Sequence, residues 1–147
     1  GWKNVMAFRM NFITVSNPFD DDVPPDYEQF YLGGPNNIRG YDDREINIRG
    51  ATGQKEGGRT AWFYNMEYRI PVLENTFSVM LFQDGGMVSE QSYSFDADFK
   101  ASMGIGVRVQ SPMGPIRLDF GYRFTETYAG ANDKGQFEPH FSFGQQF

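Results

Sequence analysis

Regular alternation of apolar and polar residues in the second half of the chain constrains the fold more than any other feature. From Phe99 to Val109 every odd position is apolar, while the even positions hold charged and polar residues and two glycines. After the turn SPMGP the alternation resumes from Ile116 to Phe124, and two arginines and an aspartate share the opposite face. Successive side chains of a strand point to opposite faces, so both segments predict long β-strands.

The same period-two pattern recurs less regularly along the rest of the chain. It covers residues 2–12, 60–72, 77–81 and 137–147. The connections alternate between tight turns, LENT and SPMG, and long polar segments, of which 15–59 is the longest. No segment with a helical period competes. The sequence therefore predicts an all-β fold of about six antiparallel strands.

Two architectures fit this pattern, and they differ in whether the apolar face contacts lipid or the protein interior. Strands of about 11 residues suit a membrane crossing better than the usual soluble length of about 5 to 6. Aromatic residues make up 17% of the chain, although its mean hydropathy is only −0.54. We expect a segment of a transmembrane β-barrel, with the apolar face toward lipid and the charged face toward a wet interior. The alternative is a soluble sandwich or lipocalin-like barrel with the apolar face inside.

Composition argues against several classes of function. The chain has no cysteine and a single histidine, His140, so thiolate or histidine metal sites and a Ser-His triad are not expected. A net charge of −6 argues against nucleic acid as a partner. We find no nucleophile elbow and expect no enzymatic activity, cofactor or metal. The chain begins at Gly1 rather than at Met, and we expect it to be one piece of a longer protein.

A glycine-rich segment, YLGGPNNIRGYDD, occupies residues 31–43 within the longest polar stretch. Gly33, Gly34 and Gly40 can adopt positive φ at little steric cost, so the chain can fold back sharply there. Such a loop can deliver one side chain, Arg39, to a chosen point. The alternative is an exposed surface loop that carries no specific contact.

A second NIRG sequence at 47–50 makes Arg49 a rival to Arg39. Only Arg39 follows a glycine pair and precedes an aromatic residue, Tyr41. Arg39 is therefore the preferred candidate.

Four segments, in this order along the chain, resemble the BamA-type outer-membrane assembly barrels. The glycine-rich loop is similar to the large-loop signature of that family, a V/I-R-G-F/Y core after a glycine pair. LFQDGG is similar to its F-x-D-x-G motif, SMGIGVRVQSPMGPIRLDFGYRF to its penultimate hairpin, and HFSFGQQF to a last strand with an aromatic end. The matching residues are Gly33, Gly34, Ile38, Arg39, Gly40 and Tyr41 in the loop, Phe82, Asp84, Gly86, Gly104 and Gly106 on the wall where the loop would dock, and Phe141, Phe143, Gly144 and Phe147 in the last strand.

The resemblance implies a non-enzymatic protein of the bacterial outer membrane that inserts unfolded β-barrel proteins at a seam between its first and last strands. Pro139 and Gly144 in the last strand would make pairing at the seam less continuous, since Pro lacks a donor. Their alternative role is ordinary barrel curvature. Six strands are fewer than the about eight of the smallest single-chain barrels, so the missing partners are further barrel strands or other copies of the chain.

Three other functions fit a barrel of this kind. A two-partner secretion pore shares the loop signature but exports a soluble polypeptide. A patatin-linked autotransporter uses a similar barrel as a membrane anchor, and a passive porin needs no such loop. The domains that precede the barrel would distinguish the first two from an assembly protein.

The strand pattern also predicts the partner of the loop arginine. Asp84 shares its parity with Ser78 and so points to the interior, where we expect it to bind Arg39 through the guanidinium fork. Glu67 and Asp119 also point inward and are the expected substitutes. The two glycines of the G-x-G motif are expected to clear space for the loop backbone.

Overall fold

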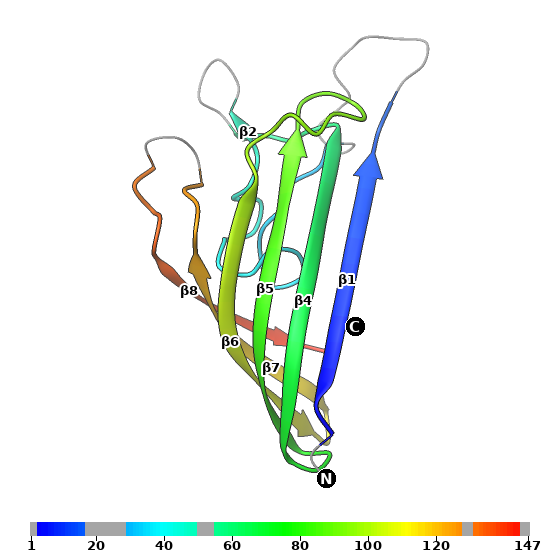
Figure 1. Cartoon of the computed structure of the whole chain (residues 1–147), viewed down its shortest axis with the longest axis vertical. Coiled ribbons are helices and arrows are strands. Elements are labelled where there is room, and N and C mark those ends of the chain that lie inside the picture. Colours follow the sequence, from blue (N-terminus) through cyan, green and yellow to red (C-terminus); the bar gives the residue numbers. More distant parts are fainter. Residues whose placement is uncertain (1–2, 17–28, 50–54, 128–130, 145–147) are drawn as a thin grey trace.

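Six long strands form one curved antiparallel sheet in the order β1-β4-β5-β6-β7-β8 (Figure 1). The structure is a computed structural model and describes residues 3–16, 29–49, 55–127 and 131–144. The predicted all-β fold of about six antiparallel strands is confirmed. A second sheet, formed by two very short strands between β1 and β4, was not predicted. The strands are β1 (Val5–Thr14), β2 (Ile48–Arg49), β3 (Lys55–Glu56), β4 (Thr60–Leu73), β5 (Phe77–Ser89), β6 (Lys100–Ser111), β7 (Gly114–Arg123) and β8 (Phe137–Phe143).

Connections at the two ends of the sheet differ in length. Three residues, 74–76, join β4 to β5, and residues 112 and 113 join β6 to β7. Asn75 takes a positive φ of 60° in the first of these turns. The opposite end carries the long connections, including 15–59 between β1 and β4. The described part of the chain contains no helix with the length and apolar character needed to cross a membrane.

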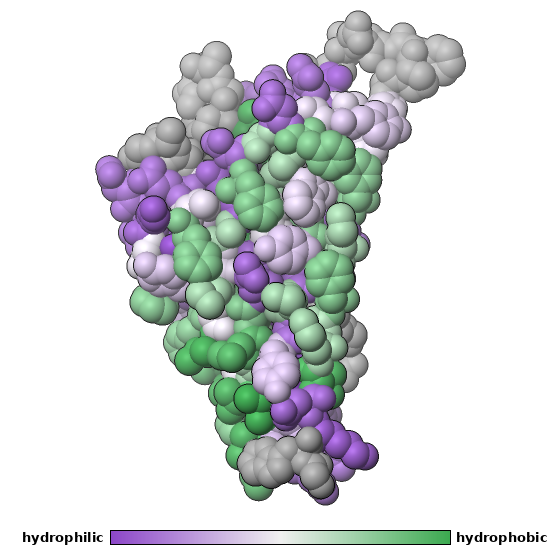
Figure 2. All heavy atoms as spheres, in the orientation of Figure 1, coloured by the Kyte–Doolittle hydropathy of each residue, from purple (hydrophilic) through white to green (hydrophobic). Residues whose placement is uncertain are grey.

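The two faces of the sheet differ in polarity as the alternation predicts. On β7 the side chains of Arg117 and Asp119 are buried, whereas Phe120 on the other face is exposed. The convex face of β1, β4, β5 and β6 carries a broad apolar band, with hydrophilic residues gathered toward its two ends (Figure 2). Exposed apolar side chains include Met6 at 70% and Phe141 at 67%. A soluble sandwich would bury this face, so the apolar-inside alternative is wrong for the described chain.

The long connection between β1 and β4 folds back onto the concave face of the sheet (Figure 1). Its residues join side chains of β4 and β5 in one buried apolar cluster. That cluster consists of Leu32, Ile38, Tyr41, Ile46, Ala61, Phe63 and Val88. The concave face is thus covered by a loop instead of by a second layer of strands.

Candidate functional site

The glycine-rich loop forms a compact turn because three of its glycines adopt backbone angles that other residues rarely take. Gly33, Gly34 and Gly40 have φ of 115°, 96° and 94°. The N–H of Gly34 donates to the carbonyl of Tyr41 at 2.8 Å and so closes the turn. A side chain at Gly33 would run into the carbonyl of Asp42. The turn projects Arg39 onto the wall of the sheet.

Arg39 binds Asp84 of β5 through three hydrogen bonds. The backbone N–H, Nε and Nη2 of Arg39 donate to the Asp84 carboxylate at 3.0, 2.6 and 2.7 Å. Nη1 donates to Glu67 of β4 at 2.6 Å, and the guanidinium lies 3.9 Å above the ring of Phe82. The predicted contact with Asp84 is present, and Glu67 binds in addition to Asp84 and not in its place. All four side chains are buried.

Further arginines neutralise the carboxylates around Arg39. Arg69 donates to Glu67 at 2.7 Å, and Arg108 donates to Asp119 at 2.5 Å. Asp119 lies 3.8 Å from Arg39, so it contributes charge without a hydrogen bond. Burial lowers the pKa of Arg39, but the hydrogen bonds and charges of its carboxylate partners outweigh burial, and the net shift is upward. The guanidinium therefore stays charged inside the wall.

Backbone groups at residues 39 and 40 contact three more strands. Ser102 of β6 donates to the carbonyl of Arg39, and Arg123 of β7 donates through Nε to the carbonyl of Gly40. The N–H of Gly40 donates to Nε2 of His140 on β8 at 2.8 Å. With the side-chain contacts of Arg39, this dipeptide bonds to every strand from β4 to β8.

Gly121 of β7 provides the space for this approach. A Cβ at Gly121 would meet the N of Gly40 and its Cα, the latter at 2.5 Å. We expected Gly104 and Gly106 to make this space, and that expectation is wrong. A Cβ at Gly104 would meet the carbonyl of Phe120 and, at 2.5 Å, the Phe82 ring, and one at Gly106 would meet the Asp119 carboxylate. These two glycines therefore make room for groups of the wall, since the loop crosses the sheet one strand further on.

Gly86 also serves the wall and not the loop. A Cβ there would meet the backbone carbonyl of Trp62 at 2.5 Å and Phe63 of the neighbouring strand β4. Gly86 thus allows β4 and β5 to lie close together at the loop end of the sheet.

Ile38 and Tyr41 hold the loop on both sides of the 39–40 dipeptide. Both side chains are fully buried in the apolar cluster under the loop. The hydroxyl of Tyr41 donates to the carbonyl of Thr125 at 2.7 Å, and its ring lies 4.9 Å from the guanidinium of Arg123. Apolar burial and one polar anchor thus fix the loop beside its ionic contacts.

The Omp85 superfamily domain matches residues 2–147. The chain belongs to the Omp85 superfamily. This match covers the loop, the wall on which it docks and the last strand.

Individual members of the superfamily are similar over most of this chain. The outer membrane protein assembly factor BamA of Nitratidesulfovibrio vulgaris is 38% identical over 131 residues, which are 86% of this chain and 16% of that protein. The chloroplastic outer envelope protein 80 of Arabidopsis thaliana is 31% identical over 113 residues, which are 71% of this chain and 14% of that protein. The chain therefore spans less than a fifth of the length of either relative.

A solved structure supports the fold. The crystal structure of BamA from Haemophilus ducreyi lacking POTRA domains 1-3 matches with a TM-score of 0.62 and 19% identity, over 94% of this chain and 33% of that chain. The six-stranded sheet of this Omp85 chain thus has the fold of part of a β-barrel wall.

A second ionic cluster fixes the Omp85 loop at the loop end of the sheet. Arg123 binds Glu45 and Asp133, each at 2.7 Å, and lies 3.6 Å from Glu138 of β8. Burial raises the pKa of Asp133, but hydrogen bonds from Thr127 and the charge of Arg123 outweigh burial and lower it overall. This cluster joins the loop to the connection that precedes β8.

The outer edge of β8 in this Omp85 segment has no neighbouring strand within the described sheet. The N–H of Gly144 donates to Pro115 at 2.8 Å, and the N–H of Arg123 donates to Gln136 at 3.1 Å. Backbone groups alternate between the two sides of a strand, so the even-numbered residues of β8 face β7 and the odd-numbered ones face the free edge. The nitrogen of Pro139 thus lies at the free edge and leaves the pairing with β7 intact.

The other residues predicted for the last strand are Phe141, Phe143, Gly144 and Phe147. Phe141 and Phe143 point outward and are exposed, as the alternation predicts. Gly144 ends the strand with a φ of 106°. Phe147 lies outside the described residues.

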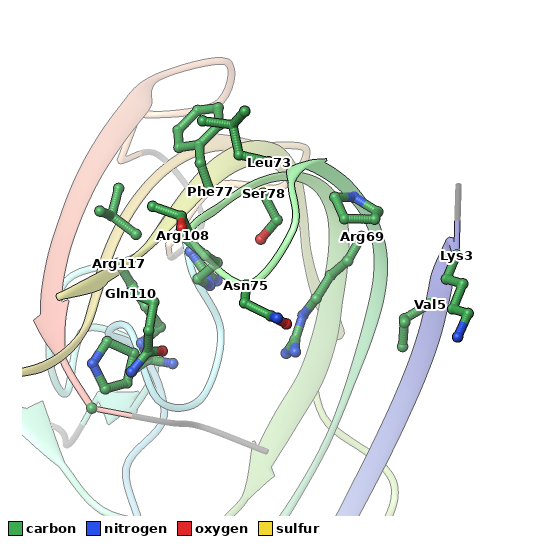
Figure 3. A pocket seen from close by; sticks show the side chains of 15 residues that line it. Lys3, Val5, Arg69, Leu73, Asn75, Phe77, Ser78, Arg108, Gln110 and Arg117 are labelled. Atoms are coloured by element: carbon green, nitrogen blue, oxygen red, sulfur yellow. The ribbon is translucent and has the colours of Figure 1, made fainter. Parts of the chain in front are cut away.

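A cavity of about 280 Å³ opens at the turn end of the sheet (Figure 3). Arg69, Arg108 and Arg117 are among its lining residues, together with Asn75 from the β4–β5 turn. In Figure 3 Arg69 and Asn75 point toward the same opening. The cavity continues the charged interior toward the short turns. No cluster of possible metal ligands occurs among the residues that the structure describes.

Four residues that contact the 39–40 dipeptide were not predicted as loop contacts: Gly121, Ser102, Arg123 and His140. Each lies on the inward parity of its strand, which is the sequence signal that was available. An odd or even position in a strand shows which face a side chain lies on, but not where a distant loop crosses the sheet. The pattern therefore could not identify these residues as loop contacts.

Proposed function

We propose that this chain is the C-terminal wall segment of an outer-membrane β-barrel that inserts other β-barrel proteins into that membrane. The observation that carries the proposal is the dipeptide 39–40, which bonds to five consecutive strands and ends beside an open strand edge. Similarity to the bacterial relative, which is an outer membrane protein assembly factor, supports the same function.

The outward face suits contact with lipid. Exposed phenylalanine side chains lie along β1 and β8, and β1 also exposes methionines. Because the inner face of the wall carries buried ion pairs, this apolar outer face is the one that can contact lipid. Trp62, Tyr64 and Phe99 stack near the loop end, with ring centroids 5.7 to 6.4 Å apart. A group of aromatic rings at one end of the strands matches the aromatic girdle that membrane barrels place at the membrane interface.

The edge of β8 supplies the means of insertion. An unpaired edge in lipid costs several kcal/mol for each unsatisfied backbone group, so it takes up any strand that completes it. In the closed barrel that strand is the first strand of the wall, and Pro139 denies it one hydrogen bond. A seam weakened in this way can exchange the first strand for a strand of an incoming protein.

The loop keeps the wall in shape while the seam opens. Arg39 and its carboxylates fix the curvature of β4 to β7 from inside, because a buried network of charges is costly to break. The role assigned to the loop is therefore mechanical, and it needs no cofactor or catalytic residue.

Crosslinking during assembly tests the proposal. A photoreactive residue at Phe141 or Phe143 in the full-length protein is expected to crosslink an unfolded β-barrel substrate, and a label at buried Met80 serves as the control. Crosslinks to a soluble secreted polypeptide inside the barrel would instead indicate a secretion pore. If neither class of polypeptide is captured while the barrel is folded, the chain is a membrane anchor and the proposal is wrong.

A further inference from the structure

His140 connects the last strand to the loop. Its side chain is buried on the inner face of β8, and its Nε2 accepts the hydrogen bond from the N–H of Gly40 at 2.8 Å. A histidine nitrogen that accepts carries no proton, so the imidazole is neutral and its proton lies on Nδ1.

The loop is held firmly on the strands that precede β8. Asp84 and Glu67 bind the side chain of Arg39, and Ser102 and Arg123 bind the backbone at 39 and 40. The loop is therefore a fixed support that does not depend on the position of β8. β8 is a seven-residue strand, the shortest of the six, and β7 is its neighbour in the described sheet. A strand of that length forms few backbone hydrogen bonds with β7 to keep it in place.

We propose that His140 is a positioning residue that holds β8 against the rest of the wall by accepting the Gly40 hydrogen bond, and that loss of this acceptor frees β8 to open. Easier opening of the seam is the expected consequence, and this consequence rests on the proposed function. The coupling of the loop to β8 does not depend on it.

Protonation is the natural means of removing the acceptor. An imidazolium donates from both nitrogens and has no lone pair for the loop N–H. The charged groups that face His140 are Asp119 directly opposite on β7, Asp84 on β5, and Arg39 and Asp42 in the loop. Asp119 and Asp84 already bind Arg108 and Arg39, and the Asp42 side chain bonds to Glu138, so none of the three carboxylates is free to hold the imidazolium in the same place.

Hydrogen exchange of the full-length protein in micelles tests the coupling. His140→Leu removes the acceptor and keeps an apolar side chain, and we expect the β8 amides that face β7 to exchange about fivefold to tenfold faster, as for one lost hydrogen bond. His140→Gln places an amide oxygen near the position of Nε2 and should restore protection. Ser142→Ala is the matched control, because Ser142 shares the strand and the inward face and should leave exchange unchanged.

Acidification separates hydrogen bonding from packing. Between about pH 7.5 and about pH 4, exchange in β8, corrected for its intrinsic pH dependence, should rise in the wild type and stay constant in His140→Gln. Equal protection of β8 in the wild type and His140→Leu at both pH values would overturn the inference. So would a failure of His140→Gln to restore protection while β5 remains protected. These readouts do not require substrate insertion, so they fail independently of the proposed function.

Discussion

Arg39 and Asp84 are 45 positions apart in the sequence, yet they are joined by three hydrogen bonds of 2.6 to 3.0 Å in a fully buried environment. The backbone N–H takes part as well as the guanidinium, so the carboxylate fixes both the side chain and the path of the loop. The contact ties the loop to β5 at the level of the Phe82 ring.

A double-mutant cycle measures this contact. Arg39→Ala and Asp84→Ala should each destabilise the folded barrel by about 3 to 5 kcal/mol, because each leaves a buried charge without its partner. The double mutant should lose less than the sum, with a coupling of about 1 to 3 kcal/mol in the free energy of unfolding in micelles. Arg39→Lys keeps the charge but not the fork and should fall between wild type and Arg39→Ala. Simple additivity would mean that Arg39 is held mainly by other groups.

Gly121→Ala should lift the loop from the wall. The added methyl would occupy the position of the Gly40 backbone, which cannot move without breaking the contacts of Arg39. We expect faster exchange at residues 38–41 and a loss of about 1 to 3 kcal/mol, typical of overpacking. The same substitution in a protein whose residues 31–43 are replaced by a short Gly/Ser linker should have no such effect. An equal loss in both proteins would place the clash elsewhere.

Spin labels on β8 test which face contacts lipid. A label at Phe141 should be accessible to oxygen dissolved in the bilayer, and a label at Ser142 should not, because adjacent residues of a strand face opposite sides. Ile105 on β6 should behave as Phe141 does. Equal accessibility at positions 141 and 142 would contradict the assignment of the outward face to lipid.

Pro139 and Pro115 provide a matched pair for the seam. Pro139→Ala adds a donor at the free edge, so the closing strand should bind more tightly and insertion of substrate should slow by several-fold. Pro115→Ala adds a donor that faces β8, because the carbonyl of Pro115 already accepts from Gly144. It should protect β8 from exchange and slow insertion less than Pro139→Ala does, because it strengthens the pairing of β8 with β7 and not the seam itself. The proposed seam fails this test if the two variants insert substrate at the same reduced rate.

Acid should release the connection that precedes β8. Because the pKa of Asp133 is lowered in the folded protein, its contribution to stability is present above the ordinary value of 3.8 and is lost as the pH falls below it. A spin label at Lys134 should therefore become more mobile between about pH 4 and about pH 2. In Asp133→Asn the label should be mobile throughout this range. A label that stays immobile at low pH in the wild type would show that Arg123 does not hold this segment through Asp133.

The sequence by itself determined the strands, the polarity of their faces and the inward direction of Asp84 and Glu67. These properties depend on neighbouring residues only, since an extended backbone places successive side chains on opposite faces whatever lies beyond it. The glycines at 33, 34 and 40 likewise marked a sharp turn, because positive φ is a property of single residues.

Only the tertiary structure decided where the loop lands. The contacts of Gly40 with Gly121 and His140 join positions 81 and 100 residues away, and they depend on the curvature of the sheet and the register of four strand pairs. A shift of the loop by one strand would have placed it over Gly104, as we expected, with the same sequence pattern. The Phe82 ring already occupies that space, and this packing between distant residues leaves no periodic signal in the chain.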